Sequence, residues 1–178
     1  MKIKKRWIAP FVIMSLLAVS GLFWTPTVAD ATGPFNGVDT IVTADVAWLL
    51  TSSCLVLLMT PGLSFFYGGM VGKKNVISTM LQSFICLGVV TLLWVVVGFS
   101  LAFGDSLGFI FNGTYYGLIG NPTQFAFFDQ VGSLPHNKMA STIPFILFAL
   151  FQMKFAVITP AIITGSFAER VRFISYLL

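Results

Sequence analysis

The sequence has few charged residues, because only 9% of its 178 residues are Asp, Glu, Lys or Arg. Water-soluble domains carry about 25% charged residues, so the composition excludes an ordinary soluble domain. Histidine and cysteine are scarce too, because the sequence has one histidine, His136, and two cysteines. Cys54 and Cys86 lie in different apolar stretches and do not have the spacing of metal ligands. No nucleophile–base pair or metal-ligand cluster occurs within those stretches. The sequence therefore predicts neither an enzyme nor a bound cofactor.

Apolar residues are abundant instead: 57% of the chain is hydrophobic and 15% is aromatic. They form four long windows, with a further one opening at Phe173: Trp7–Trp24, Val46–Phe66, Val76–Phe103 and Ile143–Ala168. A helix that crosses a bilayer needs about 20 such residues. The sequence therefore predicts an all-α fold, a polytopic transmembrane helical bundle in a lipid bilayer.

Basic residues gather at the ends of these windows. They are Lys2, Lys4, Lys5 and Arg6 before the first, Lys73 and Lys74 after the second, and Arg170 and Arg172 after the fourth. Cytoplasmic loops carry such an excess of Lys and Arg. This pattern places the connection Gly104–Lys138 outside the cytoplasm. It leaves no basic face for nucleic acid, so the net charge of +4 does not predict nucleic-acid binding.

Residues 1–31 are typical of a secretory signal peptide. A basic start precedes the apolar run Trp7–Trp24, and the small residues Ala29 and Ala31 fit an A-x-A cleavage pattern. The alternative is an uncleaved first span, which gives the same topology. On the first interpretation, residues 32–45 form an extracytoplasmic N-terminus and residues 46–178 form the membrane domain.

The connection Gly104–Lys138 is rich in aromatic residues and turn pairs. The aromatic residues are Phe109, Phe111, Tyr115, Tyr116, Phe125, Phe127 and Phe128. Aromatic side chains are enriched where a membrane meets water. This pattern favours an interfacial aromatic belt over a ligand site.

Two further patterns concern helix packing. Thr60, Ser64, Gly68 and Gly72 recur at every fourth position, and such a stripe of small residues lets helices approach closely in lipid. Pro61 and Pro160 each interrupt one helical hydrogen bond. We interpret the stripe as a packing face and the prolines as kinks rather than as ion-binding breaks.

The most informative stretch begins at Phe151. Phe151 and Phe155 share a helical face, and Lys154 lies beside them. Lys154 is about 15 Å along its helix from Pro144, near the bilayer centre, where a lysine costs about 2.5–3.5 kcal/mol. It must therefore face protein or water, either in a solute pathway or at a structural contact. Spacing alone favours an apolar surface for the aromatic residues, although such rings can attract a cation.

Three segments resemble the first three helices of the ammonium transporter (Amt/Mep/Rh) family. They are PGLSFFYGGMVGKKN (Pro61–Asn75), WVVVGFSLAFG (Trp94–Gly104) and FQMKFAVITPAIITGSFAERVRF (Phe151–Phe173). The resemblance covers about Asp45 to Leu178. It implies the first part of an eleven-helix fold with two inverted five-helix repeats, in a homotrimer of the cell (inner) membrane.

The resemblance also implies a function, an ammonium/ammonia channel or transporter, and a set of pathway residues. Phe151 is similar to a vestibule aromatic and Phe155 to the outer gate phenylalanine, while Leu63 and Phe66 are similar to residues near the cytoplasmic pore exit. Ammonium is expected to bind outside and lose a proton, so that ammonia crosses the apolar pore. A cytoplasmic PII-type regulatory protein is a candidate partner.

The chain departs from the family pattern in two respects. Lys154 stands where bacterial members hold a small residue, which favours a helix or subunit contact over pore exposure. The family's twin pore histidines and second gate phenylalanine belong to helices beyond Leu178, and His136 cannot replace them. We therefore interpret the chain as an N-terminal fragment that is inactive alone. The alternative function is a membrane ammonium sensor or regulatory subunit on the same scaffold.

Overall fold

The computed structural model describes residues 12, 15, 16, 19, 20, 41–111, 114–171 and 173–176. The predicted signal segment and its cleavage site fall almost wholly outside this part of the chain, so both stay predictions. Within it, three helices are long and apolar enough to cross a membrane: Thr43–Met70, Val76–Phe103 and Phe145–Phe167. They coincide with three of the predicted windows. The predicted helical membrane bundle is therefore confirmed.

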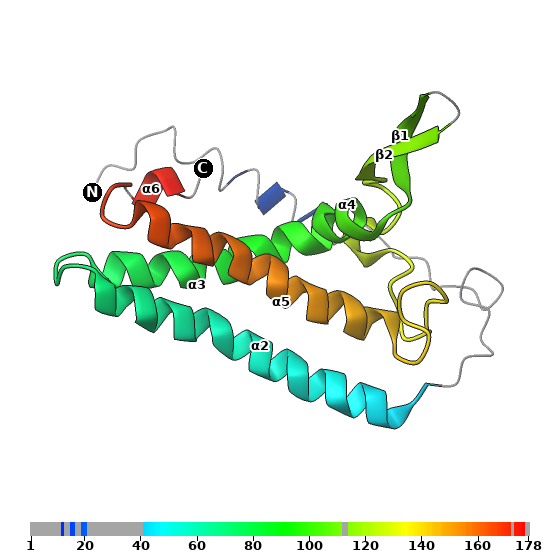
Figure 1. Ribbon diagram of the computed structural model, residues 1–178, viewed down its shortest axis with the longest axis horizontal. Coiled ribbons are helices and arrows are strands. Elements are labelled where there is room, and N and C mark those ends of the chain that lie inside the picture. Colours follow the sequence, from blue (N-terminus) through cyan, green and yellow to red (C-terminus); the bar gives the residue numbers. More distant parts are fainter. Residues whose placement is uncertain are drawn as a thin grey trace.

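The long helices run side by side (Figure 1). Helix α2 (Thr43–Met70) is followed by α3 (Val76–Leu93), which continues through the π-helical turn η2 (Trp94–Gly98) into α4 (Phe99–Phe103). Helix α5 (Phe145–Ile163) packs against both α2 and α3 and ends in the 3-10 turn η4 (Thr164–Phe167), before the short α6 (Phe173–Tyr176). Pro61 and Pro160 lie inside α2 and α5, and neither breaks its helix.

The small-residue stripe of α2 lies where α3 packs. Thr60, Ser64 and Gly68 are buried, and Ser64 Oγ donates a hydrogen bond to the carbonyl of Met80, 3.2 Å away. A Cβ added at Gly68 would lie 2.9 Å from Cγ of Met80, closer than van der Waals contact permits. The predicted packing role is confirmed for these three positions, whereas Gly72 is exposed.

The connection Gly104–Lys138 contains a hairpin that the hydropathy pattern did not predict. Strand β1 (Ser106–Phe111) pairs in antiparallel fashion with β2 (Thr114–Gly120), and a 3-10 turn, η3 (Ala126–Phe128), follows. Aromatic and β-branched residues favour strands, and Asn-Gly favours a two-residue hairpin turn. These local signals lie in a stretch that hydropathy alone marks only as a connection. The described part of the chain is mostly helical, as predicted, and this two-stranded hairpin lies between two of the spans.

The buried core lies at the end of the bundle where this connection folds over α4 and α5. Phe99 and Phe145 are fully buried, with ring centroids 5.4 Å apart, and Phe125 packs against both. Trp94 Nε1 donates a hydrogen bond to the carbonyl of Ala149, 3.1 Å away. Phe125 therefore packs inside the protein, against Phe99 and Phe145, and is not part of an exposed aromatic belt.

Candidate functional site

The two aromatic residues of α5 form a ring pair. Phe151 and Phe155 lie one helical turn apart, with centroids separated by 5.2 Å and ring planes at 77°. Such edge-to-face geometry places the positive edge of one ring against the negative face of the other. Phe151 is half-buried, and Phe155 is 41% exposed. An exposed ring face on a membrane helix is chemically able to attract a cation.

Lys154 lies at the middle of α5, between these two residues in sequence. It is half-buried, whereas its neighbour Met153 is buried and Phe155 is exposed. Lys154 therefore lies at the edge of α5 between the face that packs on the other helices and the face that is exposed. An amine at this depth has to find polar partners or water, since hydrocarbon offers neither.

The predicted pair on α2 lies near the other end of the bundle. Leu63 is half-buried and Phe66 is 60% exposed. The ring of Phe66 is tilted against that of Tyr67, with centroids 5.5 Å apart. Both predicted residues precede the connection to α3, which carries Lys73 and Lys74.

Tyr67 joins α2 to α5, and sequence reasoning missed this residue. Its hydroxyl donates a hydrogen bond to the carbonyl of Ile162, 2.8 Å away. A Cβ at Gly165 would lie 2.6 Å from the Tyr67 ring, so only glycine permits this approach. The only signal in the sequence was the glycine itself, placed where a membrane helix ends.

The structure does not bring the four predicted residues into one cluster. Ile162, which Tyr67 contacts, follows Phe155 by roughly two helical turns, or about 10 Å along the axis. Phe66, which neighbours Tyr67, therefore lies at a different level from Phe155, on a neighbouring helix.

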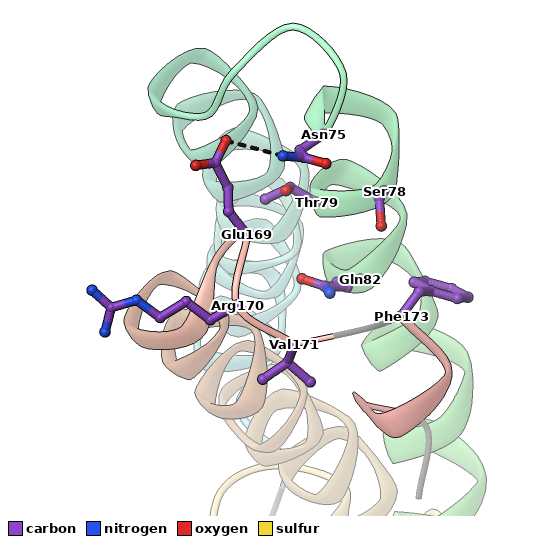
Figure 2. Close-up of a pocket in the computed structure, with 8 residues that line it drawn as sticks. All are labelled: Asn75, Ser78, Thr79, Gln82, Glu169, Arg170, Val171 and Phe173. Atoms are coloured by element: carbon purple, nitrogen blue, oxygen red, sulfur yellow. Dashed lines mark hydrogen bonds between the residues drawn. The ribbon is translucent and has the colours of Figure 1, made fainter.

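Glu169 ties the α2–α3 connection to the end of α5 (Figure 2). One carboxylate oxygen accepts hydrogen bonds from the backbone N–H of Gly72 at 2.6 Å and from Asn75 Nδ2 at 3.2 Å. The bond from Gly72, followed by that from Asn75, lowers the pKa of Glu169 below its ordinary value of 4.5. We call this arrangement the Glu169 clamp.

A cavity of about 380 Å³ opens beside the Glu169 clamp. Its lining residues are Asn75, Ser78, Thr79, Gln82, Glu169, Arg170, Val171 and Phe173. Figure 2 shows Gln82 extending from α3 toward the segment that carries Arg170 and Val171. Gln82 Oε1 is buried and accepts no hydrogen bond from the described part of the chain. This polar recess lies at the end of the bundle that the charge pattern predicts to be cytoplasmic.

His136 lies at the opposite end and belongs to the packed core. It is 5% exposed, and its ring stacks on Phe145 with centroids 4.6 Å apart. Burial, and then the nearby charge of Lys138, lower the pKa of His136 below its ordinary value of 6.5. His136 lies in the connection between α4 and α5, where its ring has a packing role.

These features define a multi-span helical membrane protein with aromatic residues along α5 and a polar clamp at one end. A sequence profile described as the Ammonium Transporter Family matches residues 47–178. The chain is 46% identical over 139 residues to an ammonium transporter of Mycobacterium bovis, and 45% identical over 134 residues to one of Bacillus subtilis. The chain belongs to the Ammonium Transporter Family.

Solved structures agree with this assignment. The N240A mutant of Candida albicans Mep2 superposes with a TM-score of 0.64 at 28% identity, over 84% of this chain and 32% of that one. The two bacterial alignments each cover 75% of this chain, but only 29% and 30% of the relatives. The chain thus spans about three tenths of their length. Its curated relatives are named transporters rather than enzymes.

Proposed function

We propose that the intact protein moves ammonium or ammonia across a membrane, and that this chain supplies three of its spanning helices. The observation that carries the proposal is the family match over residues 47–178, together with relatives named ammonium transporters. Because the chain spans about three tenths of those relatives, the proposal concerns the intact protein. It does not assign transport to these helices alone.

The Phe151–Phe155 pair suits the outer step of this transport. A cation over an aromatic face gains about 0.5–2 kcal/mol, depending on how far it is desolvated. Carrying the charge further between apolar helices is far more expensive, because an unpaired ion loses its hydration. Transfer of a proton from ammonium to water outside the pore leaves neutral ammonia, which crosses at much lower cost. We assign Phe155 to the gate, Phe151 to the vestibule, and Leu63 and Phe66 to the exit.

Replacing Phe155 tests the assignment of the gate. We expect Phe155→Ala in the intact transporter to change ammonium uptake or the discrimination between ammonium and methylammonium. Phe155→Leu is the matched variant, because it keeps an apolar side chain of similar reach but removes the aromatic face. Uptake of labelled methylammonium by cells that lack other ammonium transporters measures both. Wild-type uptake and discrimination in the alanine variant would refute the assignment.

The same cells separate transport from the alternative, an ammonium sensor or regulatory subunit. A transporter restores growth on low ammonium by itself, because it moves the nitrogen source into the cell. A sensor changes signalling but leaves uptake at the background rate. Transport is favoured here because the related proteins carry that name.

We extend the proposal to assembly and placement. The intact protein forms a homotrimer in the cell (inner) membrane, with residues 1–31 removed as a signal peptide and residues 32–45 outside. Family membership and the positions of Lys73, Lys74 and Arg170 support this orientation. A PII-type protein is the expected cytoplasmic partner. N-terminal sequencing of the purified protein tests cleavage, and chemical cross-linking in membranes tests the trimer.

A further inference from the structure

The β1–β2 hairpin exposes apolar side chains to an unusual extent. Ile110 is 74% exposed and Leu118 is 75% exposed, and most of their neighbours are exposed as well. The other large exposed residues are Leu107, Phe109, Phe111, Tyr115, Tyr116 and Ile119. Residues 106–120 contain no charged residue. A water-facing hairpin ordinarily places polar side chains on at least one face, and this one does not.

Hydrogen bonds fix the base of the hairpin to the end of a membrane span. The backbone N–H of Gly104 donates to the carbonyl of Ser100 in α4, at 2.8 Å. The N–H of Asn121 donates to the carbonyl of Asp105 at 2.9 Å, which closes the two ends of the hairpin on each other. Gln124 Nε2 then donates to Oδ2 of Asp105 at 3.1 Å. The hairpin therefore leaves the bundle at the depth where α4 ends.

The direction of the hairpin also matters. Figure 1 shows β1 and β2 standing off to one side of the bundle instead of lying along α3 or α5. Strands of six and seven residues carry the hairpin roughly 20 Å away from its base. In the sequence, only Gly104 and the exposed, charged Asp105 separate the span Val76–Phe103 from the hairpin.

We propose that this hairpin lies on the lipid bilayer, at the boundary between headgroups and acyl chains of the leaflet in which α4 ends. Two open strand edges keep unpaired backbone groups, which hydrocarbon cannot satisfy, so the ribbon stays at the boundary and does not enter the core. Phe109 and Tyr116 stack with centroids 5.8 Å apart, and aromatic side chains of this kind favour that depth. The absence of charge removes the cost of approaching the acyl chains.

The test places a fluorophore on the hairpin of the intact transporter in vesicles. Cysteine replaces Ile110 or Leu118 in a cysteine-free background and is labelled with an environment-sensitive dye. Phosphatidylcholine vesicles then carry a nitroxide quencher either near the headgroups or deep in the acyl chains. The matched control is Ser133→Cys, an exposed position of the same connection outside the hairpin.

With the shallow nitroxide, we expect quenching at both hairpin positions to be several-fold stronger than at Ser133. With the deep nitroxide, we expect quenching at the hairpin positions to be weaker than with the shallow one. Equal quenching at the hairpin and at Ser133 would overturn the proposal, because the ribbon would then lie in water. A blue-shifted dye that no lipid nitroxide quenches would overturn it too, since a second copy or another part of the protein would then cover the hairpin. The readout requires no transport activity, so it is independent of the proposed function.

Discussion

At the scale of single residues, Glu169 joins two parts of the chain that lie far apart in the sequence. Its hydrogen bonds to Gly72 and Asn75 span 97 and 94 positions. The backbone of Glu169 has a φ of 65°, in the left-handed region that residues other than glycine rarely adopt. Such a conformation costs about 1–3 kcal/mol and persists where surrounding contacts enforce it. The Glu169 clamp is therefore a defined structural link between α5 and the α2–α3 connection.

We expect Glu169→Gln to lower the thermal stability of the purified intact protein. The substitution keeps the shape of the side chain but replaces a charged acceptor by a neutral one, and hydrogen bonds to ionised groups are the stronger kind. Thermal unfolding in detergent measures the change. Arg170→Gln is the matched control, because Arg170 is the exposed neighbour that takes no part in the clamp. Equal melting temperatures for both variants and the wild type would contradict this role.

The clamp also predicts a dependence of stability on pH. The pKa of Glu169 is lower in the folded protein than its ordinary value of 4.5, so above pH 4.5 the ionised form favours the folded state. This contribution is lost as the pH falls from 4.5 through the lowered pKa. The difference in melting temperature between wild type and Glu169→Gln should therefore shrink in acid. A difference that stays constant down to pH 3 would argue against the clamp.

A substitution at Lys154 tests whether the middle of α5 lines the conduction pathway. We expect Lys154→Met to leave ammonium uptake by the intact transporter intact, because a lysine at a helix or subunit contact acts through packing. Methionine keeps the length of the apolar stem. Uptake measured between pH 5 and 8 is the readout. A large change in the pH dependence of uptake would instead place the amine in the pathway.

At the scale of elements, the α2–α3 contact explains why a stripe of small residues was informative. Gly68 lets the two helices approach, because its Cα lies against Met80, and Ser64 Oγ donates a hydrogen bond across the contact. Lipid provides no hydrophobic force between helices, so close packing has to hold them together. The stripe could be recognised from spacing alone because helical periodicity places every fourth residue on nearly one face.

The glycines of α2 give a matched pair of substitutions. Gly68→Val should lower the yield and the melting temperature, because the new side chain overlaps Met80, and overpacking costs about 1–3 kcal/mol. Gly69→Val should have a much smaller effect, since a Cβ there meets no atom within 4 Å. Both variants introduce the same residue one position apart in the same helix. Similar losses for the two would contradict the predicted packing.

Features that depend on residues close together in the sequence could be predicted, whereas contacts between residues far apart in the sequence could not. Spans were predictable because twenty apolar residues in a row have few alternatives to crossing a membrane. The hairpin was missed because its strands are short and lie in a stretch marked only as a connection. The burial of Phe125 depends on Phe99 and Phe145, which are distant in sequence. Tyr67 was missed for the same reason, because its partner Ile162 is 95 positions away.

The Phe151–Phe155 pair shows a further distinction. Its geometry was predictable, because residues four apart on a helix meet, and the rings do contact each other. A pore function was not predictable from spacing, since most aromatic stripes on membrane helices face lipid or the protein core. The resemblance supplied that hypothesis. Testing the pore hypothesis requires the residues on other helices that would line a conduction path together with Phe151 and Phe155.

At the scale of the whole molecule, the three spans leave much apolar surface open. Trp48, Leu55 and Ile77 are among the exposed side chains. Some of this surface faces lipid in any membrane protein, and family relatives are more than three times as long as the matched region. The function is therefore proposed for a protein of the length of these relatives and not for the three spans alone.

Ammonium flux through the purified intact protein tests the central proposal most directly. The protein is reconstituted into vesicles that enclose a pH-sensitive dye, and an inward ammonium gradient is applied. We predict a saturable change in internal pH, faster than in protein-free vesicles and altered by Phe155→Ala. A rate equal to that of protein-free vesicles, from protein shown to be folded and inserted, would contradict the proposal that this family member conducts ammonium or ammonia.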